Sequence, residues 1–236
     1  MKTGKSVSSV LCALILAAVL LFSCSFTAFA ADEIEESWFN DAFFLGDSLT
    51  GSLGTYCMVN GGLGDALIVH MNGLACHNIV DRDFEISLMG KTYPVEDAVK
   101  ASGAKKLFLM LAMNDIGLPV DDLKADWVTL LGRFREKNPD LEIYIQSGTP
   151  VIEDNLYFTK KNMLEYNEML KKLCEEENCT YVDVTDGLKN EDGFLKKDFQ
   201  MEYTNDSVHM NFEGCAVWVS NLRNPLSYAE PGKNEE

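Results

Sequence analysis

The feature that most constrains this fold is the alternation of short apolar runs with longer amphipathic segments. Short apolar runs predict buried strands at 42–45, 66–69, 106–111, 141–145 and 181–184. Longer segments predict helices at 49–57, 95–101, 121–137, 160–176 and 212–222, and in 121–137 and 160–176 apolar residues recur at helical spacing. Buried strands that alternate with helices form parallel sheets covered on both faces. The chain is therefore predicted to be an α/β protein with a central parallel sheet.

Chemically useful side chains follow several of these strands. Ser48 follows the first predicted strand, Asn114 follows the third, and a loop begins after Gln146 at the end of the fourth. In an open parallel sheet, ligands bind outside the carboxyl ends of the strands. We therefore expect these residues to converge on one edge of the sheet.

The first of these side chains is a candidate nucleophile. The motif Gly46-Asp47-Ser48-Leu49 places a serine between a strand and a helix, where the helix N-terminus stabilises negative charge. The alternative is a serine that merely caps the helix. Thr50 stands where the Gly-x-Ser-x-Gly elbow of the α/β-hydrolases needs its second glycine, so that motif is absent.

A candidate general base lies near the other end of the chain, in Asp206-Ser207-Val208-His209. Side chains three residues apart can meet across one turn, so Asp206 could accept the imidazole N–H of His209 and fix its tautomer. Serine, histidine and carboxylate are the nucleophile, base and orienting group of a serine hydrolase. The alternative is a helix cap beside a surface histidine, and His70 and His77 are the other histidines of the chain.

Two further residues could stabilise an oxyanion. Asn114 follows the third strand and its side-chain amide is a hydrogen-bond donor, while Gly73 follows the second strand and could bring a backbone N–H close to the same oxygen. Each is also an ordinary residue for a turn at a strand end. All four features occur in one order along the chain, which favours the catalytic interpretation.

At this point the chain resembles the GDSL, or SGNH, hydrolase family. The matching blocks are Gly46-Asp47-Ser48-Leu49, Gly73, Ala112-Met113-Asn114-Asp115 and Asp206-Ser207-Val208-His209. The resemblance extends from about Ala42 to Trp218. It departs from the family pattern at Ala112, where glycine is usual, and this methyl group could crowd the backbone near Asn114.

The resemblance implies a flavodoxin-like three-layer α/β/α sandwich that hydrolyses carboxylic esters, with no metal and no organic cofactor. By this likeness Ser48 would be the nucleophile, His209 the general base, and Asp206 the group that orients His209. The oxyanion hole would combine the N–H of Ser48, the N–H of Gly73 and the side-chain amide of Asn114.

The expected substrate is less constrained. Tyr157 and Phe158 lie in the loop 150–160 and could bind it, either by stacking on a sugar or by lining an acyl pocket; they could equally pack in the core. An acetylated extracellular or cell-wall glycan is the first expectation, and a lipid or aryl ester, as for a lysophospholipase, is the alternative. A catalytically silent surface-binding protein on the same fold is a third interpretation.

Residues 1–30 resemble a secretory signal peptide rather than part of the fold. Lys2 and Lys5 precede the apolar stretch 10–22, and Ala28-Phe29-Ala30 supplies a small-x-small cleavage site after Ala30. The apolar stretch is short for a membrane span. The alternative is a lipoprotein signal with Cys24 as the attachment site. Secretion or a cell-surface location is therefore expected.

The remaining chain is expected to form one domain, 31–224, followed by a flexible tail, 225–236. Removing the signal takes away two lysines and no acid, which lowers the net charge from −17 to −19. Such a charge repels nucleic acid. An odd number of cysteines remains, with no zinc-like spacing, although Cys174 and Cys179 could close a local loop.

Overall fold

The computed structural model describes residues 32–82, 84–202 and 207–229. The predicted signal peptide, including Cys24, lies outside the described residues, and so does Asp206. The rest forms an α/β unit around a six-stranded sheet of order β2-β1-β5-β6-β7-β8, in which neighbours from β2 to β7 are parallel. The predicted fold class is confirmed.

The elements follow the predicted alternation closely. The strands of the sheet are β1 (Ala42–Gly46), β2 (Leu67–His70), β5 (Lys106–Met110), β6 (Glu142–Gln146), β7 (Thr180–Val182) and β8 (Tyr228–Ala229). The helices are α2 (Ser48–Asn60), α3 (Cys76–Asp81), α4 (Val95–Ser102), α5 (Val120–Lys137), α6 (Lys160–Glu176) and α7 (Phe212–Arg223). Short 3-10 turns are η1 (Glu36–Phe39), η2 (Lys197–Phe199) and η3 (Pro225–Ser227).

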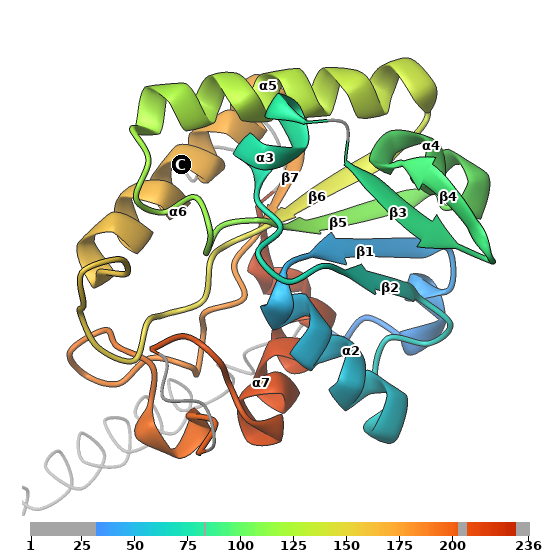
Figure 1. Ribbon diagram of the computed structural model, residues 1–236. Helices are drawn as coiled ribbons and strands as arrows, with labels where there is room; N and C mark the ends of the chain where they lie inside the picture. Colours follow the sequence, from blue (N-terminus) through green and yellow to red (C-terminus); the bar gives the residue numbers. More distant parts are fainter. Residues whose placement is uncertain (1–31, 83, 203–206, 230–236) are drawn as a thin grey trace, which may run out of the picture. The chain divides into compact units, whose positions relative to one another are not determined.

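The helices cover the two faces of the sheet. Helices α2 and α7 pack together on one face, and α3, α4, α5 and α6 cover the other (Figure 1). This is the three-layer α/β/α sandwich that the resemblance implies. Within the described residues, no helix has both the length and the hydropathy needed to cross a bilayer.

Stacked aromatic rings hold the central strands in register. Phe44 of β1 pairs with Phe108 of β5, and Phe108 pairs with Tyr144 of β6. Both ring pairs stack with centroids 4.5 Å apart and planes 8° from parallel. Because β1 and β5 are fully buried strands, this ladder fixes the strand ends from which the site loops leave.

Several elements were not predicted from the sequence. Among them are α3 and an antiparallel hairpin of β3 (Glu85–Leu88) and β4 (Lys91–Pro94). The hairpin turn lies at Met89 and Gly90, which both have positive φ, +50° and +76°. Such turns usually contain Asn-Gly or Asp-Gly, so the pair Met-Gly did not predict this turn.

The expected flexible tail needs a correction at its start. Pro225–Ser227 form η3, and Tyr228–Ala229 form β8, which pairs antiparallel with β7. The N–H of Asp183 donates to the carbonyl of Ser227 over 2.8 Å. Tyr228 and Ala229 therefore form the edge strand of the sheet, and Ser227 is bonded to the residue that follows β7. Residues 230–236 lie outside the described residues.

Candidate active site

The candidate site lies where the strand order of the sheet reverses. The chain runs from β1 outward to β2 on one side, and then returns to place β5 on the other side of β1. In doubly wound sheets, this switch point at the carboxyl ends is where ligands bind. Ser48 follows β1 after a single residue, Gly73 follows β2, and Asn114 follows β5. The topology therefore brings these predicted residues to one edge.

Ser48 is the first residue of α2, and its hydroxyl lies 2.9 Å from Nε2 of His209, 161 residues away in the chain. The helix is capped by Asp47, whose Oδ1 accepts from the N–H of Leu49 over 2.9 Å. Because Asp47 does the capping, the Ser48 hydroxyl is left for the histidine. His209 lies just before α7, and the predicted partner of its other ring nitrogen, Asp206, is outside the described residues.

Gly46 permits the tight approach of the strand end to the helix. A Cβ at this position would lie 2.6 Å from the carbonyl oxygen of Met110 and would overlap the hydroxyl of Thr50. Any larger residue would therefore push β1, α2 and β5 apart at the point where Ser48 begins the helix. Steric crowding at position 46 therefore explains the glycine of the first motif block.

Asp47 also belongs to the candidate site, although its place in the first motif block predicted no role for it. Its side chain is 0% exposed, and its Oδ2 accepts from Nδ2 of Asn114 over 3.1 Å. Burial raises the pKa of Asp47 to about 6, although the Leu49 N–H and the nearby His209 favour the charged form. Its position just before a helix, in an Asp-Ser pair, was the available signal.

The Asn114 amide is fully engaged. Besides Asp47, it donates to the carbonyl of Leu74 over 3.1 Å, and these two bonds use both of its hydrogens. Among the described residues, the N–H groups of Ser48 and Gly73 have no acceptor. Gly73 has a φ of +75°, a conformation that favours glycine. Two of the three predicted oxyanion donors are thus free backbone groups.

The departure at Ala112 is accommodated by a second glycine. Ala112 is fully buried, and a Cβ placed on Gly148 would lie 2.9 Å from the Ala112 methyl and closer still to the sulfur of Met163. Because Gly148 has no side chain, the extra methyl at Ala112 fits without displacing Asn114.

The loop with the predicted substrate-binding residues lies beside the histidine. The N–H of Ile152 donates to the carbonyl of Ser207 over 2.7 Å, and Nδ2 of Asn155 donates to the Ser207 hydroxyl over 3.0 Å. Tyr157 is 75% exposed, whereas Phe158 is half-buried against the core. The adjacent Leu156 is 94% exposed, and nothing in its local sequence distinguishes it.

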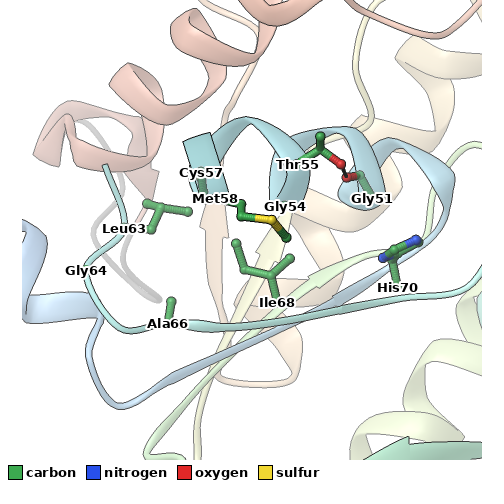
Figure 2. A pocket seen from close by; sticks show the side chains of 10 residues that line it. All are labelled: Gly51, Gly54, Thr55, Cys57, Met58, Leu63, Gly64, Ala66, Ile68 and His70. Atoms are coloured by element: carbon green, nitrogen blue, oxygen red, sulfur yellow. Dashed lines mark hydrogen bonds between the residues drawn. The ribbon is translucent and has the colours of Figure 1, made fainter. Parts of the chain in front are cut away.

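Neither of the other two histidines is hydrogen-bonded to the Ser48 hydroxyl. His77 Nδ1 lies 2.7 Å from Oδ2 of Asp126, a hydrogen bond that raises the pKa of His77. His70 lies at one end of a cavity of about 300 Å³ between α2 and β2 (Figure 2). Gly51 and Gly54 face that strand, where a Cβ would meet the His70 ring or the Ile68 side chain. These glycines let α2 lie close to β2.

No cluster of three His, Cys, Asp or Glu side chains able to hold a metal occurs in the described part of the chain. The cysteines described there, Cys174 and Cys179 included, are free thiols.

Solved structures share this fold. A Streptococcus pneumonia protein provisionally assigned as a platelet activating factor matches with TM-score 0.61 and 19% identity, covering 90% of this chain and 99% of that chain. A GDSL-like lipase from Bacteroides thetaiotaomicron matches with TM-score 0.56 and 13% identity, covering 82% and 90%. A catalytic mutant of an acetylxylan esterase from Geobacillus stearothermophilus matches with TM-score 0.54 and 17% identity, covering 77% and 91%.

No curated protein sequence matches the chain significantly. The model of the GDSL-like Lipase/Acylhydrolase family, a family of ester-cleaving hydrolases, matches residues 44–217. That stretch runs from β1 into α7 and contains Ser48, Gly73, Asn114 and His209. The chain therefore belongs to the GDSL-like lipase/acylhydrolase family.

Proposed function

We propose that this protein is a serine esterase with Ser48 as nucleophile, His209 as general base and Asp206 as the group that orients His209. The observation that carries the proposal is the 2.9 Å contact between the Ser48 hydroxyl and Nε2 of His209. A serine hydroxyl is a weak nucleophile unless a base lies within hydrogen-bond reach. Here the base comes from the far end of the chain, so local structure does not account for the contact.

The proposed reaction is a two-step acyl transfer. His209 takes the Ser48 proton while Oγ attacks the ester carbonyl, and the protonated imidazole then gives that proton to the departing alcohol. Water, deprotonated by His209, attacks the acyl-enzyme; the proton returns to Ser48 and the acid leaves. The oxyanion of each tetrahedral intermediate is held by the N–H groups of Ser48 and Gly73.

Asn114 is proposed as the third oxyanion donor. Its two amide hydrogens are directed at Asp47 and Leu74, so donation to substrate requires that one of them be shared with the oxyanion. The bond to buried Asp47 holds the amide in place before substrate arrives. Such preorganised donors avoid reorganisation during the reaction.

We propose an acylated extracellular glycan as substrate, in keeping with the signal peptide proposed for residues 1–30. The exposed ring of Tyr157, in a loop bonded to Ser207, supports a sugar-stacking role, with Phe158 packed behind it. The acetylxylan esterase among the structural neighbours is compatible with this substrate class. The exposed Leu156 favours a second candidate, a lipid or aryl ester.

The test is hydrolysis of p-nitrophenyl acetate, butyrate and octanoate by the chain without residues 1–30, beside its Ser48→Ala variant. We expect Ser48→Ala to lose about 10⁴-fold or more in kcat, as triad serines do. Ser52→Ala is the matched control, since Ser52 lies one turn further along α2 and its hydroxyl bonds only the carbonyl of Ser48. It should keep wild-type activity.

The outcomes separate the alternatives. Activity that falls steeply from acetate to octanoate supports the deacetylase, and release of acetate from acetylated xylan would extend that result to a glycan. Activity that rises with chain length supports the lipid ester. Wild-type protein that neither turns over these esters nor reacts with a fluorophosphonate would instead be a silent binding protein, and the esterase proposal would be wrong.

A further inference from the structure

The segment from Gly73 to Asn78 carries one proposed oxyanion donor, and almost every polar backbone group in it is bonded. Within the segment, Asn78 accepts from the N–H of Ala75 over 3.0 Å and donates to the carbonyl of Gly73 over 3.1 Å. The N–H of Leu74 donates to the carbonyl of Met71 over 3.0 Å. The unpaired N–H of Gly73 therefore sits in a segment whose backbone is otherwise held.

Asp115 supplies the strongest of the bonds that come from outside the segment. Its Oδ2 accepts from the N–H of Cys76 over 2.7 Å and lies 3.4 Å from the N–H of His77. The side chain is 1% exposed, so it is held by protein rather than by water. Asp115 follows β5 directly after Asn114, while Cys76 begins α3. One carboxylate thus ties the end of β5 to the segment that follows β2.

The buried carboxylate of Asp115 has no role in the proposed acyl transfer. Burial raises the pKa of Asp115 to about 6, although the N–H groups of Cys76 and His77 favour its charged form. Keeping such a group buried is costly. An uncharged turn residue could occupy the end of β5 without the free-energy cost of burying a carboxylate. The presence of Asp115 there therefore indicates a function beyond folding.

We propose that Asp115 is a positioning residue for the oxyanion hole, which fixes the Gly73–His77 backbone so that the N–H of Gly73 is held ready for the ester oxygen at Ser48. This inference rests on the proposed esterase function. Oxyanion donors act in the transition state and contribute little to binding of the ground state. Loosening them should therefore lower kcat and leave KM nearly unchanged.

The first experiment breaks the bond from the acceptor side. Asp115→Ala leaves the N–H groups of Cys76 and His77 without an acceptor, and we expect kcat on p-nitrophenyl acetate to fall about 10- to 100-fold, as for small misplacements of catalytic groups. Asp115→Asn keeps an oxygen acceptor, so its kcat should stay within about threefold of wild type. Binding of a trifluoromethyl ketone, which forms a tetrahedral adduct with Ser48, should weaken in step with kcat.

The second experiment breaks the same bond from the donor side. Cys76→Pro removes the N–H at the first position of α3, where proline is favoured, and Ala75 before it is already extended (φ −144°, ψ 153°). The variant should therefore fold and should repeat the kcat loss of Asp115→Ala. Combining the two changes should add little, because they remove one interaction. This variant keeps the inference testable if Asp115→Ala does not fold.

The control is Asn221→Ala on α7. Asn221 is also buried, and its amide bonds two backbone carbonyls of a loop, those of Val184 and Asp186, away from the Gly73 segment. It should lower stability without lowering kcat per active site, counted by fluorophosphonate. Wild-type kcat in Asp115→Ala and in Cys76→Pro would overturn the inference while the esterase stands, and so would an equal loss in Asn221→Ala. If the wild-type protein showed no turnover that depends on Ser48, both the esterase proposal and this inference would be wrong.

Discussion

Two of the loops at the candidate site, one after β2 and one after β6, are held in opposite ways. The Gly73–Asn78 loop is tied to the sheet by Asn114 and by the buried carboxylate of Asp115. In the loop 151–159, the turn that presents Tyr157 is held by an exposed side chain of the loop itself: Oδ1 of Asn155 accepts from the N–H groups of Tyr157 and Phe158, each over 2.8 Å.

The difference matches what each loop would have to do. Oxyanion donors must sit at fixed positions for any ester, which requires a rigid supporting shell. A loop that contacts the variable part of a substrate can rest on local bonds and present apolar side chains to solvent, as Leu156 and Tyr157 do here. Bonds to buried carboxylates therefore mark the part of the site proposed for chemistry, and bonds between exposed groups mark the part proposed for selectivity.

The comparison is tested most strongly by removing the Asn114 amide, which bonds the buried carboxylate of Asp47. Asn114→Ala deletes an oxyanion donor together with its bonds to Asp47 and Leu74, so kcat should fall about 10²- to 10³-fold. Asn60→Ala, which removes an exposed amide near the end of α2, is the control and should be neutral. Steady-state kinetics on p-nitrophenyl acetate measure both. A tenfold loss or less would show that the bonds of Asn114 to Asp47 and Leu74 matter less than we infer.

A second test measures how much the burial of the Asp115 carboxylate lowers the free energy of unfolding. A folded-state pKa of about 6 for Asp115, against an ordinary value of 3.8, means that the native state binds the extra proton between these values. The stability that protonation contributes is therefore present below about pH 4 and is lost as pH rises through 6. The Asp115→Asn variant has no carboxylate to ionise, so its stability does not fall in this way. Its free energy of unfolding should exceed that of wild type by up to about 3 kcal/mol at pH 7.

Urea unfolding at pH 4, 5, 6 and 7 measures this difference. The groups that face Asp115 are His77 and Cys76 on α3, Asp126 on α5 and Tyr166 on α6, and all of them are the same in both proteins. The gain should grow across that range. A gain that is constant with pH, or that shrinks, would mean that the carboxylate is not costly and that its burial calls for no functional explanation.

Much of the fold followed from the sequence because strand and helix periodicity are local signals. The same signals placed Ser48 and Asn114 at strand ends, and the parallel topology then brought them to one edge. The contact between Ser48 and His209 was expected from the pattern of a base and an orienting acid, although Asp206 lies outside the described residues. That role for Asp206 stays a prediction.

The supporting bonds could not be found in the same way. Asp47 and Asp115 each bond groups that are distant in the chain, Asn114 for the first and Cys76 for the second, and no periodicity encodes such pairs. The hairpin at Met89 and Gly90 was missed because its turn uses an uncommon residue pair. The edge strand Tyr228–Ala229 was not predicted because two residues carry no strand periodicity, and the strand is defined only by its pairing with β7.

The smallest expected effect lies in the exposed loop. Asn155→Ala removes the acceptor that shapes the turn at Tyr157 and also the bond to Ser207, whereas Ser207→Ala removes that bond alone. We expect Asn155→Ala to lower kcat/KM about three- to tenfold, chiefly through KM and unequally across acetate, butyrate and octanoate, because it changes the surface that meets the acyl or sugar group. Ser207→Ala should leave the chain-length preference unchanged. If Asn155→Ala lowered kcat equally on all three esters, the loop would act on His209 rather than on substrate, and the division between a chemical loop and a selective loop would fail.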